Sequence, residues 1–153
     1  MDMNIFAKRL KNLMELEGIS QRSLSMKINV DRKSIRYWLS GEYFPQYHAL
    51  IKLSVYFRVR MDYLAGLEDS MESGSNFALD DISAAAVSLR FHQRLNAYMD
   101  TSGMTKYALA KQLNIDQKAL TKWFTQGSMP EVSTLVKLAQ LMKVSMQELL
   151  LGE

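Results

Sequence analysis

The sequence predicts an all-α fold with two tandem five-helix domains joined by an acidic linker. Apolar residues recur at helical spacing in several separate stretches, which is the pattern of amphipathic helices. Only 2 Pro and 7 Gly occur among 153 residues, so the turn signals of a strand-rich protein are scarce. A hydrophobic content of 48% is enough for folded cores. The third observation is an internal repeat.

The chain matches itself at an offset of 85 residues from Phe6 to Leu67, without an insertion. The identical pairs include Phe6 and Phe91, Leu10 and Leu95, Gly18 and Gly103, Asp31 and Asp116, Trp38 and Trp123, and Pro45 and Pro130. This self-similarity indicates an internal duplication. We therefore expect a first domain at 1–67, an acidic and partly helical linker at 68–89, and a second domain at 90–153.

Five helical segments are predicted in the first copy, and most have a start or stop signal. They are expected at 5–17, 21–27, 32–40, from Pro45 to about residue 57, and near 61–64. Ser20 and Asp31 stand where a side-chain oxygen caps a helix start. Gly18 and Gly41 stand where a left-handed residue ends a helix.

The second copy adds two local signals. The linker becomes helix-prone from about Asp81, so it is expected to extend the first helix of this copy. Ser145 and Glu148 have the S-x-x-E spacing of a capping box at the start of the last helix.

Charge is distributed unevenly along the chain. Residues 1–67 hold 11 Lys and Arg against 6 Asp and Glu (net +5), residues 68–89 hold none against 5, and residues 90–153 hold 8 against 5 (net +3). Two basic globular segments are typical of a nucleic-acid binder, although solvated surface charge gives the same count.

The third predicted helix has two opposed faces. Ile35 and Trp38 lie on an apolar side, while Arg32, Lys33 and Arg36 lie on the outward side together with Tyr37. A helix with this distribution is suited to contact an anionic partner.

With these residues in view, each copy resembles the helix-turn-helix domain of the phage repressor and Cro family, also called the xenobiotic-response-element family. The pattern S-Q-x-x-L, then V-D-x-x-x-I-x-x-W, then a Gly-containing turn with Pro and K-L-S carries the resemblance. Its members here are Ser20, Gln21, Leu24, Val30, Asp31, Ile35, Trp38, Gly41, Pro45, Lys52, Leu53 and Ser54. The resemblance implies a lambda-repressor-like five-helix domain whose third helix enters the DNA major groove.

The resemblance also implies which residues touch DNA. Base reading falls to Arg32, Lys33, Arg36 and Tyr37 in the first copy, and to Gln117, Lys118, Thr121 and Lys122 in the second. Phosphate contact falls to Ser20, Gln21, Tyr43, Thr105, Lys106 and Ser128. The chemistry agrees, since Arg can bridge two acceptors of guanine and Gln can pair both ways with adenine.

One departure from the family concerns the first and third helices. Many members join them by an Arg and an acid, but those positions hold Met14 and Leu39 here, and Met99 and Phe124 in the second copy. We expect apolar packing in place of the ion pair, an exchange that is often neutral or stabilising. The turn glycine of the second copy, Gly127, comes one residue later than Gly41.

Other residue types favour structural roles. Trp38 and Trp123 are expected to pack in the core, and His48 and His92 to be ordinary surface histidines. Two roles remain for Tyr37: a solvated side chain, or a contact with DNA. No Ser-His-acid set, paired carboxylates, phosphate loop or metal-ligand spacing is present, so neither enzymatic activity nor a cofactor is expected.

The sequence favours a sequence-specific transcriptional regulator of bacterial or phage origin, bound to double-stranded DNA. The alternative is a protein-interaction module or antitoxin-like partner, with the second copy used for dimerisation. A homodimer is possible, and no small-molecule ligand is evident. Zero Cys, no transmembrane stretch and no signal-peptide apolar region indicate a cytoplasmic protein.

Overall fold

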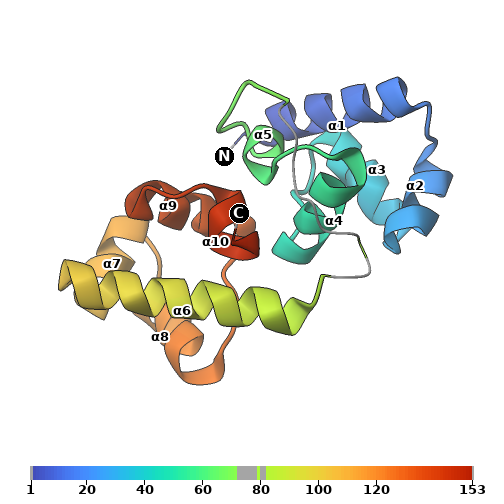
Figure 1. Ribbon diagram of the computed structural model, residues 1–153. Helices are drawn as coiled ribbons and strands as arrows, with labels where there is room; N and C mark the ends of the chain where they lie inside the picture. Colours follow the sequence, from blue (N-terminus) through green and yellow to red (C-terminus); the bar gives the residue numbers. More distant parts are fainter. Residues whose placement is uncertain (1, 72–78, 80–81, 153) are drawn as a thin grey trace. The chain divides into compact units, whose positions relative to one another are not determined.

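The computed structural model describes residues 2–71, 79 and 82–152. These residues form ten α-helices, divided between two compact units at 1–81 and 82–153 (Figure 1). The first unit contains α1 (Met3–Glu17), α2 (Gln21–Ile28), α3 (Arg32–Ser40), α4 (Tyr47–Phe57) and α5 (Met61–Leu64). The second contains α6 (Ala84–Ser102), α7 (Lys106–Leu113), α8 (Gln117–Gln126), α9 (Val132–Met142) and α10 (Met146–Leu151).

The predicted fold class, two tandem all-α domains of five helices each, is confirmed. The first helix begins at Met3 rather than at residue 5, because Asp2 caps it. The fourth begins at Tyr47, two residues after Pro45, and Gln46 occupies its N-cap position. These differences shift the starts of two helices by two residues, and every predicted helix of the first unit is present.

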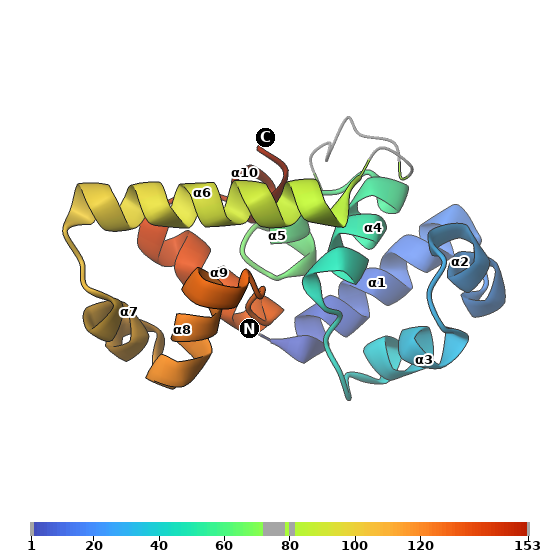
Figure 2. The same ribbon diagram turned by 90° about the horizontal axis from the view of Figure 1, so that it is seen from below.

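The first helix of the second unit is longer than its counterpart, as expected. Helix α6 has 19 residues and α1 has 15, and Figure 2 shows α6 along its whole length. Ser83 caps α6 by accepting a hydrogen bond from the Ala86 N–H. Residues 84–89 of the predicted linker are therefore helical, whereas its residues 72–78, 80 and 81 lie outside the described residues.

The predicted helix caps of the first unit are confirmed. The Ser20 hydroxyl oxygen accepts from the Ser23 N–H at 3.1 Å, and the Asp31 carboxylate accepts from the Lys33 N–H at 2.9 Å. Each satisfies a first-turn donor that has no partner within its own helix. Gly41 ends α3 in the left-handed conformation, with φ of 76°.

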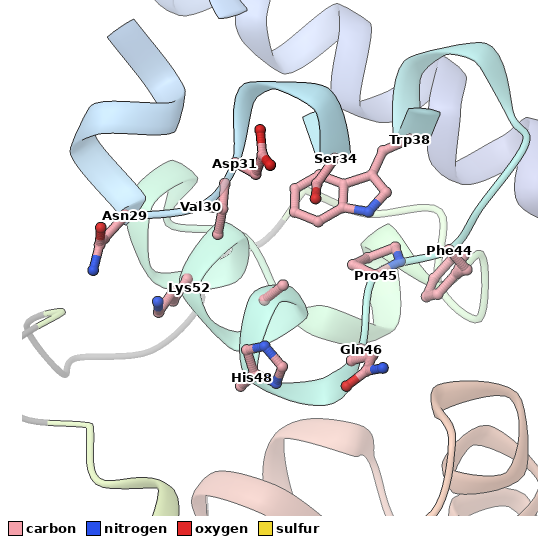
Figure 3. A pocket seen from close by; sticks show the side chains of 11 residues that line it. Asn29, Val30, Asp31, Ser34, Trp38, Phe44, Pro45, Gln46, His48 and Lys52 are labelled. Atoms are coloured by element: carbon pink, nitrogen blue, oxygen red, sulfur yellow. The ribbon is translucent and has the colours of Figure 1, made fainter. Parts of the chain in front are cut away.

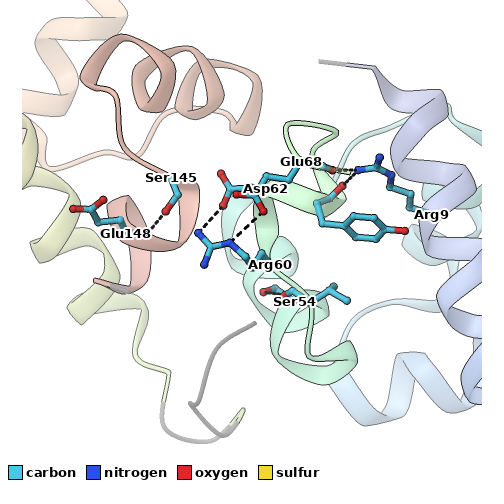
Figure 4. A network of polar contacts seen from close by, with 9 residues as sticks. Arg9, Ser54, Arg60, Asp62, Glu68, Ser145 and Glu148 are labelled. Carbon is cyan, nitrogen blue, oxygen red and sulfur yellow. Dashed lines mark hydrogen bonds and ion pairs between the residues drawn. The ribbon is translucent and has the colours of Figure 1, made fainter. Parts of the chain in front are cut away.

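The predicted capping box at α10 is half formed. Ser145 accepts from the Glu148 N–H at 3.0 Å, which is the first half of the motif (Figure 4). The predicted helix start at Ser145 is therefore confirmed. The Glu148 carboxylate pairs with Arg94 of α6 at 3.0 Å, so the reciprocal half of the capping box is not formed.

Each unit has its own apolar core, built from the same positions of the repeat. Eight apolar side chains at equivalent positions of the repeat are completely inaccessible to solvent in both units. They are Phe6, Leu10, Leu24, Ile35, Leu50, Leu53, Met61 and Leu64 in the first unit, and Phe91, Leu95, Leu109, Leu120, Leu135, Leu138, Met146 and Leu149 in the second. All eight pairs are separated by 85 residues, so the duplication reproduces the core position by position.

Equivalent arginines tie the first helix of each unit to the last segment in different ways. Arg9 donates to the carbonyl oxygens of Tyr63 and Glu68, and its guanidinium lies 4.2 Å from the Tyr63 ring centroid (Figure 4). Arg94 instead pairs with Glu148, and Arg90 donates to the Leu150 carbonyl at 2.8 Å. In both units, hydrogen bonds from an arginine join the first helix to the last segment, but the acceptors differ.

Replacing Leu10 tests the contribution of the first core. Leu10→Ala is expected to lower the free energy of unfolding of the first unit by about 2–5 kcal/mol, because it removes a buried isobutyl group and leaves a cavity. Urea unfolding is followed by Trp38 fluorescence in a Trp123→Phe background, so that only the first unit reports. Leu16→Ala on the same helix is the control, since Leu16 is 68% exposed. Equal losses from both changes would contradict this account of the core.

Candidate nucleic-acid interface

Helices α2 and α3 form a helix-turn-helix, and α7 and α8 form its duplicate. The turn begins at Asn29, whose φ of 52° is left-handed, and Asn114 takes the same conformation at 54°. Asparagine tolerates this region because its short polar side chain bonds locally. The Asp31 cap then starts α3, and the Asp116 cap starts α8 by accepting from the Lys118 N–H at 2.9 Å. Helices α3 and α8 thus start from the same local geometry.

Helix α3 separates an apolar inner face from a basic outer face. Ile35 is fully buried and Trp38 is 5% exposed. Arg32, Lys33 and Arg36 are exposed, as the helical period requires. The predicted packing role of Trp38 is confirmed, and the three cations are held on the opposite side of the helix.

The aromatic ring of Tyr37 lies close to two of the three exposed cations of α3. The Lys33 ammonium and the Arg36 guanidinium carbon each lie 5.7 Å from the centroid of the half-buried Tyr37 ring. The Tyr43 ring meets it edge-on, at 5.1 Å between centroids. Both cations are within the range of a cation–π attraction. The i, i+4 spacing of Lys33 and Tyr37 could have revealed part of this cluster, but the contact with Tyr43 could not be foreseen.

The four base-reading residues expected in the second unit lie together on α8. Gln117, Lys118, Thr121 and Lys122 are all exposed and line one shallow depression of about 430 Å³. The Thr121 hydroxyl donates to the Gln117 carbonyl at 2.8 Å, so it has an acceptor within its own helix. This face carries two cations and an amide, where α3 carries three cations.

The residues expected at phosphates lie at helix starts and in the following loops. Ser20 and Thr105 are exposed N-caps, and Gln21 is half-buried in the first turn of α2. Tyr43 is 60% exposed in the loop after α3. Ser128 is half-buried in the loop after α8.

Lys106 has a neighbour that the sequence analysis did not identify. Its ammonium lies 4.7 Å from the centroid of the Phe124 ring. Phe124 occupies the position at which the resemblance implied an acid, and both Phe124 and Met99 are half-buried. The phenylalanine at this position therefore also places an aromatic ring next to the Lys106 ammonium at the start of α7.

The two histidines differ from each other. His48 is exposed, as predicted, but the prediction for His92 was wrong. His92 is half-buried: its Nδ1 lies 2.7 Å from the Ser88 carbonyl oxygen, and its Nε2 lies 3.2 Å from that of Ser128. His92 thus links α6 to the loop that was expected to contact phosphate.

No cluster of three or more His, Cys, Asp or Glu side chains suited to a metal occurs in the part of the chain that the structure describes. Within residues 2–71, 79 and 82–152, no helix is both long and apolar enough to cross a membrane. The exposed faces of α3 and α8 remain the main candidate sites.

Comparison with known families identifies the domain. A family model described as helix-turn-helix matches the chain twice, at residues 10–64 and 95–149. The first match contains all of α2 and α3, and the second contains all of α7 and α8. No curated protein and no solved structure matches the chain. The chain belongs to the helix-turn-helix family of DNA-binding regulators of the xenobiotic-response-element type, and it carries the family's domain twice.

Proposed function

We propose that this protein is a sequence-specific transcriptional regulator of bacterial or phage origin that acts in the cytoplasm. Its target is double-stranded DNA, with α3 inserted in the major groove. The observation that carries the proposal is the exposed Arg32, Lys33 and Arg36 on the helix whose other face is buried. Such a helix presents charge and hydrogen-bond donors to the groove while the core holds its position.

Base reading is assigned to Arg32, Lys33, Arg36 and Tyr37 on α3. A guanidinium can donate to O6 and N7 of guanine at once, and such a bidentate pair discriminates between bases by about 1–3 kcal/mol. Arg36 has the additional support of the Tyr37 ring. A side chain whose position is already restricted loses less entropy when it binds.

The second unit is assigned a parallel role with different chemistry. Gln117, Lys118, Thr121 and Lys122 replace the arginine-rich face, so the two halves of the target site are expected to differ. Phosphate contact is assigned to Ser20, Gln21, Tyr43, Thr105, Lys106 and Ser128. The helix starts of α2 and α7 also offer free backbone N–H groups and a positive dipole end to a phosphate.

Two helix-turn-helix domains in one chain allow bivalent binding to DNA. The second contact is helped by the effective concentration that the linker imposes. Residues 84–89 of the 22-residue predicted linker belong to α6, and a connection of the 16 residues at 68–83 would span at most about 53 Å when fully extended. Successive major-groove faces of DNA are about 34 Å apart, which a stretched linker covers.

A titration against DNA tests the proposal as a whole. Binding to a selected duplex and to random duplexes is measured over a range of salt concentrations. A regulator shows a large affinity ratio between the two, together with a linear fall of log affinity with log salt. The absence of any duplex preference at every salt concentration would favour the protein-interaction module instead.

Arg36→Ala tests base reading by α3. The change is expected to weaken binding to the selected duplex by about 5–150-fold, because a bidentate base contact is lost. Binding to random duplexes should fall much less, and the thermal midpoint should stay nearly unchanged because Arg36 is exposed. Lys11→Ala on α1 is the control, since it removes one exposed cation elsewhere. An equal loss on all sequences would reassign Arg36 to a phosphate.

Tyr37 can be tested through its ring and its hydroxyl separately. Tyr37→Phe keeps the ring and is expected to retain affinity within about twofold, whereas Tyr37→Leu removes it and should weaken binding about 2–5-fold by releasing Lys33 and Arg36. Equilibrium binding to the selected duplex measures both variants. If Tyr37→Phe loses as much as Tyr37→Leu, the hydroxyl rather than the ring makes the contact.

The role of the second unit is tested by removing the charge of its reading helix. The double variant Lys118→Ala, Lys122→Ala is expected to lose nuclease protection over one half of the site and to keep it over the other. The other half should stay protected because α3 is untouched. The matched double variant Lys33→Ala, Arg36→Ala should show the reverse pattern. If the α8 variant leaves the protected region unchanged, the second unit serves dimerisation or another partner.

A further inference from the structure

The first unit contains a cavity that the DNA-reading residues do not line. It lies between α3 and α4, below the turn that precedes α3, and has a volume of about 400 Å³. Six of its lining residues carry its chemistry: Asp31, Ser34, Trp38, Phe44, His48 and Lys52. Figure 3 shows Trp38 on α3 facing the cavity from one side, with His48 and Lys52 on α4 at the other.

Lys52 supplies a positive charge with no partner in the wall. Its side chain is half-buried, and it forms no hydrogen bond or ion pair within the described residues. Although the side chain of His48 is exposed, desolvation by the groups packed around it, and then the ammonium of Lys52, lower the pKa of His48. The neutral imidazole form of His48 is therefore favoured, and it can donate or accept a hydrogen bond. This end of the cavity is suited to a carboxylate.

The acid in the wall, Asp31, is already engaged. Its carboxylate accepts the Lys33 N–H at 2.9 Å, at the positive end of the α3 dipole, which offsets its charge. An anion in the cavity thus meets less repulsion from Asp31 than from a free carboxylate. The remaining oxygen of Asp31 and the Ser34 hydroxyl are acceptors for a donor group on the ligand.

The other walls are flat and apolar. The Trp38 indole, the Phe44 ring and Pro45 contribute them, and Figure 3 shows the Trp38 and Pro45 rings at the same side of the cavity. Trp38 is 5% exposed and Pro45 is buried, so a planar ring would meet only the small accessible part of the indole together with the half-buried Phe44 ring. A ligand with an aromatic ring and a carboxylate at one end matches both parts of the wall.

The duplicate positions in the second unit provide an internal comparison. The positions of Ser34 and His48 hold Ala119 and Ser133 there, and that of Phe44 holds Met129. Lys137, the counterpart of Lys52, donates to the Leu113 carbonyl at 3.4 Å. The second unit keeps the indole, as Trp123, but it lacks the imidazole of His48, the ring of Phe44 and the hydroxyl at the position of Ser34, and its lysine has an acceptor within the protein.

We propose that the cavity between α3 and α4 of the first unit binds a small aromatic carboxylate, with the carboxylate at Lys52 and the ring against Trp38. The site takes its ligand without DNA, so the proposal is independent of DNA binding. Because Ser34 and Trp38 belong to the reading helix, the ligand contacts α3 from its inner side.

The experiment uses 4-hydroxybenzoate as the probe and the full chain as the protein. Trp38 fluorescence in a Trp123→Phe background reports binding at the cavity, and titration calorimetry gives the stoichiometry. Saturable binding at one site per chain is expected. The uncharged analogue 4-hydroxybenzyl alcohol should bind at least about 10-fold more weakly, since it has no carboxylate for Lys52.

Variants distinguish this site from any other. Lys52→Met should weaken the probe at least about 10-fold and Lys52→Arg should restore much of the affinity, whereas the matched change Lys137→Met should have no effect. Ser34→Leu, which fills the cavity and leaves Lys52 in place, should also abolish binding if Lys52→Met proves unstable. No saturable signal, equal binding of the alcohol, or unchanged binding in Lys52→Met or Ser34→Leu would overturn the proposal.

Discussion

The positions of α3 and α8 depend on the burial of two side chains in each helix. Helix α3 has 9 residues and α8 has 10, and helices this short are marginal in water by themselves. Ile35 and Trp38 bind α3 to the first core, and Leu120 and Trp123 bind α8 to the second. Burying such side chains contributes about 1.5–3 kcal/mol each. The outward face of α3, including Arg36, has a defined direction only because the inward face is packed.

The two copies agree in their cores and differ in their polar contacts. Eight fully buried apolar positions coincide after a shift of 85 residues, because a change of volume in a close-packed core is destabilising. Contacts near the surface are worth less and are free to change. Arg9 therefore binds backbone carbonyls where Arg94 binds Glu148, and Lys52 faces a cavity where Lys137 donates to a carbonyl. One fold thus presents two chemically different surfaces.

Features with a local signal were predicted well from the sequence. The caps Ser20 and Asp31 were confirmed because an N-cap bonds to an amide two or three residues away. The pairing of Glu148 with Arg94 was not foreseen, and the prediction of a surface His92 was wrong, because the partners are remote in sequence. Arg94 lies 54 residues from Glu148, and Ser128 lies 36 residues from His92. No local pattern records such a pairing.

By itself, the sequence determined the helices, their duplication and the two faces of α3. These follow from a period of 3.6 residues and from short-range capping, which are visible along one stretch of chain. The tertiary structure decided which side chains from different elements meet. It places Tyr43 against Tyr37, and it groups Trp38 with His48 and Lys52 around one cavity. Such groupings depend on how helices and loops pack together, and periodicity along a single helix contains no information about them.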